Sequence, residues 1–260
     1  MSNDDTANLS DRLKVQDIWA AIGLLSRIPV PVDHDAATER RQLATWAYPL
    51  AGLAIAFVAL IIGTVAKWFG LGPEIIAALI LTTLVVITGA MHEDGLADSA
   101  DGLWGGWTRE RRLEIMKDSR IGTFGVLALG LGLLLRWVAL TAIIANGAMW
   151  AGVLVAAITS RIPMVALMHL LNNARGSGLS AAVGRPDKTT LGIAIVVGLV
   201  LSLVLSGLAV VPLFIFLCGA TAACYLIAQA KIGGQTGDIL GASQQVAEIT
   251  ALLVLASFTG

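Results

Sequence analysis

WAYPLAGLAIAFVALIIGTVAKWF, residues 46–69, contains a single charged side chain among 24 residues. A helix that crosses about 30 Å of hydrocarbon needs roughly 20 predominantly apolar residues. The stretch does not alternate between polar and apolar residues, as the strands of a membrane barrel do. Its one charge, Lys67, lies near the end, where a long side chain can reach the membrane surface. The stretch therefore predicts a membrane-spanning helix.

Six further apolar runs of similar length follow in the chain, at 73–91, 122–144, 147–171, 189–206, 209–230 and 239–258. We therefore predict an all-α, polytopic membrane protein with about seven transmembrane helices, forming one integral membrane domain over residues 1–260. Residues 15–32 are apolar too, but Asp17, Arg27 and Pro29 interrupt them. We expect an interfacial or re-entrant helix there.

The composition agrees with a membrane protein and excludes several other classes. Hydrophobic residues make up 57% of the chain and charged residues 13%, whereas a soluble domain has about 25% charged residues. This excludes an ordinary soluble enzyme and a disordered chain. With 17 Lys and Arg against 18 Asp and Glu, the chain also lacks the basic surplus of a nucleic-acid-binding protein. Two cysteines within one apolar run predict neither a disulfide framework nor a zinc site.

Basic residues divide the connecting segments into two classes. The links at 70–72, 145–146 and 207–208 contain no Lys or Arg. The alternate connections carry Arg40, Arg41, Arg109, Arg111, Arg112, Lys117, Arg120, Arg175, Arg185, Lys188 and Lys231. Because cytoplasmic loops are enriched in Lys and Arg, we expect these connections on the cytoplasmic side, with the N-terminus inside and the C-terminus outside.

The predicted cytoplasmic segment 92–121 begins with an acidic cluster, HEDGLADSAD. If the helix continues, Asp94, Asp98 and Asp101 occupy positions i, i+4 and i+7 on one face. Such like charges repel unless a cation lies between them. Mg²⁺ prefers oxygen ligands and often bridges one or two carboxylates to substrate phosphates. The cluster therefore predicts a Mg²⁺ site at the membrane surface, with Glu93 as a further candidate ligand.

A basic cluster follows the acids directly, at Arg109, Arg111, Arg112, Lys117 and Arg120. Cationic side chains can bind the phosphate oxygens that a metal leaves free, so segment 92–121 has the parts of a catalytic loop for Mg²⁺-assisted phosphoryl transfer. The alternative is that these charges only solvate a surface loop, as most charge runs do. His92, beside the acids, either binds substrate or marks the membrane interface.

Other polar residues lie at or inside the predicted spans. Asp238 follows a glycine-rich turn and either caps the last helix or approaches the metal. Arg136, Arg161 and Glu248 lie within spans, where a charge is costly and usually functional. We expect Glu248 to pair with one of the two arginines, either to fix helix register or as part of a substrate contact. Pro163 predicts a helix break beside Arg161.

Three blocks of this sequence resemble cobalamin synthase, the adenosylcobinamide-GDP ribazoletransferase family of bacterial inner membranes. They are HEDGLADSADGLWGG at 92–106, RRLEIMKDSRIGTFGVLAL at 111–129 and GGQTGDILGA at 233–242. In the preceding opening, Ala90 stands where the family pattern has a second glycine. The resemblance implies a multi-pass inner-membrane enzyme whose active site faces the cytoplasm.

The resemblance also implies a reaction. A hydroxyl of α-ribazole, or of its 5′-phosphate, attacks the cobinamide-linked phosphorus of adenosylcobinamide-GDP, and GMP leaves, with Mg²⁺ as the cofactor. On this basis we expect Asp94, Asp98 and Asp101 as metal ligands, with Glu93 and Asp238 as lesser candidates.

The remaining roles concern substrate binding and proton transfer. Arg109, Lys117 and Arg120 are expected to neutralise the diphosphate, and either Asp101 or Asp118 to accept the hydroxyl proton. His92 is a further candidate for substrate binding. The expected partners are the two substrates and the lipid bilayer, with no nucleic acid. Other late corrinoid-pathway enzymes are implied by the family alone, and a second copy of the chain is a further candidate partner.

Two other functions compete with this interpretation. The acidic block also resembles the aspartate motif of CDP-alcohol phosphotransferases, but the arginine that follows the early Asp–Gly pair in that family is missing here. A cation-coupled transporter would place acids near the bilayer midplane and show matched halves. The densest acidic group lies in a predicted loop and no halves match, which favours an enzyme.

Overall fold

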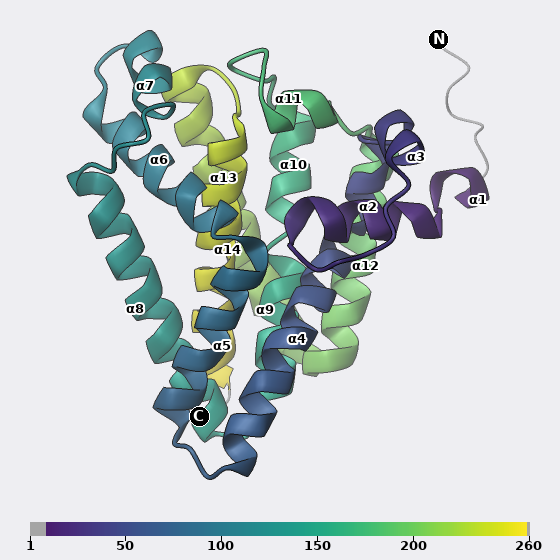
Figure 1. Ribbon diagram of the computed structural model, residues 1–260, viewed down its shortest axis with the longest axis vertical. Coiled ribbons are helices and arrows are strands. Elements are labelled where there is room, and N and C mark those ends of the chain that lie inside the picture. The colour runs from purple at the N-terminus through teal and green to yellow at the C-terminus, as the bar shows by residue number, and fades with distance from the viewer. Residues whose placement is uncertain (1–8, 259–260) are drawn as a thin grey trace.

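The computed structural model describes residues 9–258, which form a bundle of helices (Figure 1). The helices are α1 (Leu9–Arg12), α2 (Val15–Leu25), α3 (His34–Glu39), η2 (Leu43–Ala47), α4 (Tyr48–Trp68), α5 (Pro73–Thr88), α6 (Met91–Gly105), α7 (Arg109–Ile115), α8 (Thr123–Ala145), α9 (Met149–Thr159), α10 (Ile162–Leu170), α11 (Leu179–Val183), α12 (Lys188–Ser206), η3 (Gly207–Ala209), α13 (Val210–Ile232) and α14 (Gly237–Phe258). Within this range no strand forms, and the all-α prediction is confirmed.

Five helical stretches within the described range are long and apolar enough to cross a membrane, or six if the bent pair α5–α6 counts as one span. The polytopic prediction is therefore confirmed, while the number seven stays a prediction. One stretch, Lys188–Ile232, has 45 residues. A straight helix of that length would measure about 68 Å, more than twice the hydrocarbon thickness. It breaks at η3, where Gly207 has a φ of 57°, and so supplies two separate helices.

The bend between α5 and α6 ends the predicted span 73–91 early, at Thr88. Gly89 and Ala90 both adopt the left-handed conformation, with φ values of 64° and 59°, and the two helices meet at 86°. Among the described non-glycine residues, only Ala90 has a positive φ, which is a strained conformation for a residue with a Cβ. Segment 92–121 consequently begins as a helix and not as a loop.

A second break divides the predicted span 147–171 into α9 and α10. Helix α9 ends at Thr159, and α10 begins at Ile162 with Pro163 in its first turn, as the proline predicted. The break leaves Ser160 and Arg161 inside the bundle, where both side chains are almost fully buried.

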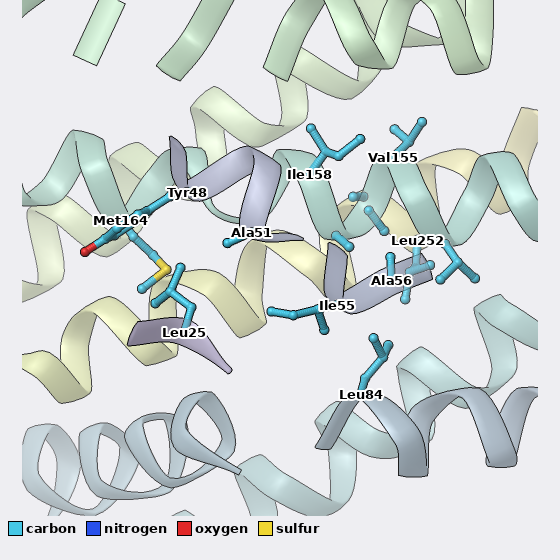
Figure 2. Close-up of a cluster of buried hydrophobic side chains, with 14 of the residues drawn as sticks. Leu25, Tyr48, Ala51, Ile55, Ala56, Leu84, Val155, Ile158, Met164 and Leu252 are labelled. Atoms are coloured by element: carbon cyan, nitrogen blue, oxygen red, sulfur yellow. The ribbon is translucent and has the colours of Figure 1, made fainter. Parts of the chain in front are cut away.

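The apolar core lies where α9 packs against both α4 and α14. Figure 2 shows Ile55 of α4, Ile158 of α9 and Leu252 of α14 in one buried cluster. Small residues allow this close packing: a Cβ on Gly52 would collide with the carbonyl oxygen of Ala157. By contrast, α8, α12 and α13 leave many apolar side chains exposed on their outer faces, as helices in contact with lipid do.

The charged connections gather at one end of the bundle, drawn at the top in Figure 1. The Arg109 guanidinium donates to the carbonyl oxygens of Ile232 and Ala174, both at 2.8 Å. Asn173 and Gln235 form an isolated β-bridge. The prediction that these connections share one side is therefore confirmed, whereas the predicted position of the N-terminus concerns residues 1–8, outside the described range.

Helix α2 lies across the bundle beside α4 (Figure 1), as expected for an interfacial helix. Its Asp17 is almost fully buried and accepts hydrogen bonds from Arg40 Nε at 2.8 Å and Trp46 Nε1 at 2.9 Å. Burial opposes ionisation of this carboxyl, but the bonds from Arg40 and Trp46 outweigh that effect and hold its pKa below the usual value. The hydrogen bonds that Arg40 and Trp46 donate to Asp17 therefore hold α2 against the segment that leads into α4.

Candidate active site

Helices α6 and α14 cross in close contact, and glycines make the contact possible. A Cβ on Gly95 would lie 2.8 Å from the Asp238 carbonyl oxygen, closer than real Cβ contacts allow, and 3.1 Å from Gly241 Cα, which is a tight contact. The crossing brings one face of α6 against the first turn of α14. It thereby joins two sequence blocks, 92–106 and 233–242, that were predicted to share a site.

Three carboxylates lie near this crossing, within electrostatic range of one another, and form what we call the acidic face: Asp94 and Asp98 of α6, and Asp238 of α14. The charges of Asp94 and Asp238 both act on Asp98. Within the described residues, Asp94 and Asp98 have neither a hydrogen-bond nor an ion-pair partner for their side chains, and they lie exposed and half-buried. Asp238 forms an ion pair with Arg175 at 2.7 Å.

Thr236, and not Asp238, caps the first turn of α14. The Thr236 hydroxyl accepts the backbone N–H of Ile239 at 3.3 Å, so Thr236 closes the first turn of α14. The Asp238 carboxylate points to Arg175 instead, on the side of the acidic face.

Glu93 does not belong to the acidic face, although the sequence predicted it as a candidate ligand. The residue is 8% exposed and turns into the bundle, because it precedes Asp94 and so lies about 100° around the helix. There it forms an ion pair with Arg136 at 3.0 Å and accepts a hydrogen bond from Gln245 at 3.1 Å.

Glu93 belongs to a buried charge network that links α6, α8, α14 and the α9–α10 break. Glu248 forms ion pairs with Arg136 at 3.3 Å and Arg161 at 3.5 Å, and it accepts from Gln244 at 2.6 Å. The prediction that Glu248 pairs with an arginine is confirmed, and it pairs with both. Two glutamates and two arginines balance each other, as buried charges require.

Asp101, the third predicted metal ligand of α6, also acts on Asp98 through its charge, but its carboxylate has backbone partners. Its carboxylate accepts the backbone N–H of Gly122 at 2.7 Å and that of Gly125 at 2.9 Å. Both N–H groups lie at the N-terminal end of α8, where backbone N–H groups have no partner within the helix. An acidic side chain stabilises this end of a helix. A Cβ at either glycine would collide with the carboxylate. In this structure Asp101 holds α6 against the start of α8.

The predicted phosphate-binding residues have other partners or stand at the surface. The Arg109 guanidinium donates to two backbone carbonyls, and Lys117 is exposed. Arg120 is exposed and pairs with Asp118 at 2.8 Å. Hydrogen bonds from Arg120 hold the pKa of the Asp118 carboxyl below its usual range, which makes this carboxylate a weaker base.

His92, the remaining predicted substrate contact, is buried. It is 1% exposed and lines a small, mainly apolar cavity of about 50 Å³ between α6, α10 and α14. Its Nε2 has no hydrogen-bond partner among the described residues. His92 precedes Asp94 by two positions, about 200° around the helix, so the ring faces away from the acidic face.

Sequence reasoning missed three polar residues next to these charges: Arg175, Gln244 and Gln245. The glutamines had a signal, since Gln244 lies four residues before Glu248 and polar residues within a span are usually functional. Arg175 had none, because its contact with Asp238 depends on a loop conformation that joins residues 63 positions apart.

The chain is similar to known proteins over almost its whole length. A family model described as cobalamin-5-phosphate synthase matches residues 17–256. The adenosylcobinamide-GDP ribazoletransferase of Bradyrhizobium diazoefficiens is 46% identical over 247 residues, covering 94% of both chains. The enzyme of Mesorhizobium japonicum is 40% identical, covering 95% of both chains. The enzyme of Azorhizobium caulinodans is 41% identical, covering 91% of this chain and 94% of its own. No solved structure is significantly similar. The chain belongs to the cobalamin-5-phosphate synthase family.

Proposed function

We propose that this protein is an adenosylcobinamide-GDP ribazoletransferase. A hydroxyl oxygen of α-ribazole, or of its 5′-phosphate, bonds to the phosphorus next to cobinamide, and the bond from that phosphorus to the GMP oxygen breaks. The hydroxyl proton passes to a carboxylate, for which Asp101 and Asp118 stay the candidates. The near full-length similarity to enzymes of this name carries the proposal, and the gathering of Asp94, Asp98 and Asp238 at one crossing supports it.

Mg²⁺ fits the acidic face in one particular way. Within the described residues, no three His, Cys, Asp or Glu side chains are grouped closely enough to hold a metal. Mg²⁺, however, is usually bound by one or two carboxylates together with substrate phosphates. Asp94 and Asp98, one helical turn apart and without other side-chain partners, supply such a pair. When bound there, Mg²⁺ neutralises the charge that develops on the phosphoryl oxygens.

The other residues of the site act as supports. Arg175 compensates the charge of Asp238 next to the pair, and Asp101 fixes the far end of the acidic helix through the α8 backbone. Helix α6 leads to the end of the bundle that carries α7 and the basic connections (Figure 1). The positive-inside rule therefore favours a cytoplasmic position for the acidic face.

The proposal is tested with the purified full-length protein in detergent, supplied with adenosylcobinamide-GDP, α-ribazole and Mg²⁺. We expect release of GMP together with a corrinoid product carrying the ribazole, and loss of both in Asp94→Asn and Asp98→Asn. Glu110→Gln, which removes an exposed acid on α7, is the matched control. Product formation from a CDP-alcohol instead would identify the second candidate family.

A further inference from the structure

A cavity of about 590 Å³ lies between the end of α2 and the α5–α6 bend. Its volume is within the roughly 300–1,000 Å³ of small-molecule sites. One wall carries Ser26 and Arg27, and the other carries Thr88, Gly89 and Asp94. The cavity therefore adjoins the acidic face through Asp94, and among the described residues that line it the one cation is Arg27, from the segment after α2.

Arg27 is held in place by its backbone, while its side chain remains free to bind. Its N–H donates to the carbonyl oxygen of Ile87 at 2.7 Å, which fixes the segment to the end of α5. The guanidinium lies on Gly89, where a Cβ would collide with Nε and come within 2.9 Å of Nη2. Within the described residues the guanidinium has neither a hydrogen-bond nor an ion-pair partner.

Of the two charged groups that line the cavity, Arg27 attracts a phosphate, whereas the Asp94 carboxylate repels one unless it holds a metal ion. A metal ion on Asp94 would present positive charge from one side, and Arg27 donates from the other in the planar geometry that matches phosphate oxygens. The residues predicted for this task are engaged elsewhere: Arg109 donates to two backbone carbonyls, and Arg120 pairs with Asp118.

We propose that this cavity binds the diphosphate of the nucleoside diphosphate substrate, and that Arg27 is its phosphate-binding residue. The inference rests on the proposed function for the identity of the nucleotide, but binding is measured independently of turnover. A lipid phosphate offers the same chemistry near an interfacial helix, so the experiment separates the two sources.

The test is calorimetric titration of the purified full-length protein with GDP, with Mg²⁺ and with EDTA. Loss of a charged hydrogen bond should weaken GDP binding by about tenfold or more in Arg27→Gln. Arg27→Lys, which keeps the charge but not the planar fork, should lie between that variant and wild type. Lys188→Gln removes an exposed cation that does not line the cavity, and it should bind GDP as wild type does.

Three results would overturn the inference: no binding of GDP by wild type, equal GDP affinity in wild type and Arg27→Gln, or GDP binding in phosphatidylcholine nanodiscs that phosphatidylglycerol abolishes. The last result would assign the cavity to a lipid headgroup. Melting temperatures of the variants identify any loss of folding. Failure of the proposed function is distinct, because wild type would then bind GDP without converting adenosylcobinamide-GDP to a ribazole-containing product.

Discussion

Replacing Glu248 by Gln tests whether the buried charge network stabilises the bundle. The substitution keeps the shape of the side chain, so it removes a charge without leaving a cavity. Glu248 is 4% exposed, and within the described residues it is the only ion-pair partner of Arg161. The variant would leave two buried arginines facing Glu93 alone. Removing one partner of a buried pair costs about 3–5 kcal/mol, which lowers the melting temperature by about 6–20 °C for a chain of this size.

The assay is thermal unfolding of the purified protein in one detergent, with wild type, Glu248→Gln and the exposed control Glu110→Gln measured together. A second variant, Glu248→Gln with Arg161→Gln, restores the balance of charge and should recover part of the lost stability. A Glu248→Gln melting temperature within 2 °C of the control would refute the reasoning. The reasoning would also be refuted if the double variant lost more stability than the two single substitutions together.

Three further changes follow from local geometry. Ala90→Gly relieves a left-handed alanine and should raise the free energy of unfolding by about 1 kcal/mol; a lower melting temperature would contradict this. Gly95→Ala inserts a methyl group against the Asp238 carbonyl oxygen, and should cost about 1–3 kcal/mol and reduce GMP release, whereas unchanged turnover would show that the crossing does not position the acids. Asp17→Asn should destabilise the protein at neutral pH. Because the pKa of Asp17 is lower in the folded state than its unfolded value near 3.8, the difference from wild type should be constant above about pH 5 and vanish as the pH falls through the lowered pKa. A difference that grows in acid would contradict the assignment.

Much of the fold was predictable because the bilayer imposes a length on each apolar run. The cost of an isolated charge within a span predicted that Glu248 needs a cationic partner. The positions of the helix breaks were only partly visible. Pro163 marked one of them, whereas the bend at Ala90 lies within a continuous apolar run, and its left-handed conformation has no signature in an alanine.

The candidate site was predictable to the level of a helix face but not beyond it. Spacing placed Asp94 and Asp98 together, and the structure keeps that pair. Spacing placed Asp101 with them too, but the i+7 position reaches α8, where free N–H groups compete for its carboxylate. The rotation of α6 about its axis decides that Glu93 faces inward, and this rotation is set by the contact of Gly95 with α14. Such tertiary contacts are not encoded in local spacing.

The shortness of α5 has a consequence for how this enzyme senses its surroundings. Its 16 residues give a rise of about 24 Å, several ångströms less than an average bilayer core. The bend, and with it Asp94, is therefore tied to the level at which acyl chains give way to headgroups. In a bilayer with longer acyl chains, the bend would lie inside the hydrocarbon layer. This hydrophobic mismatch would be relieved by local thinning of the lipid or by tilting of α5. Catalytic output should thus vary with the acyl-chain length of the host membrane, even at constant headgroup composition.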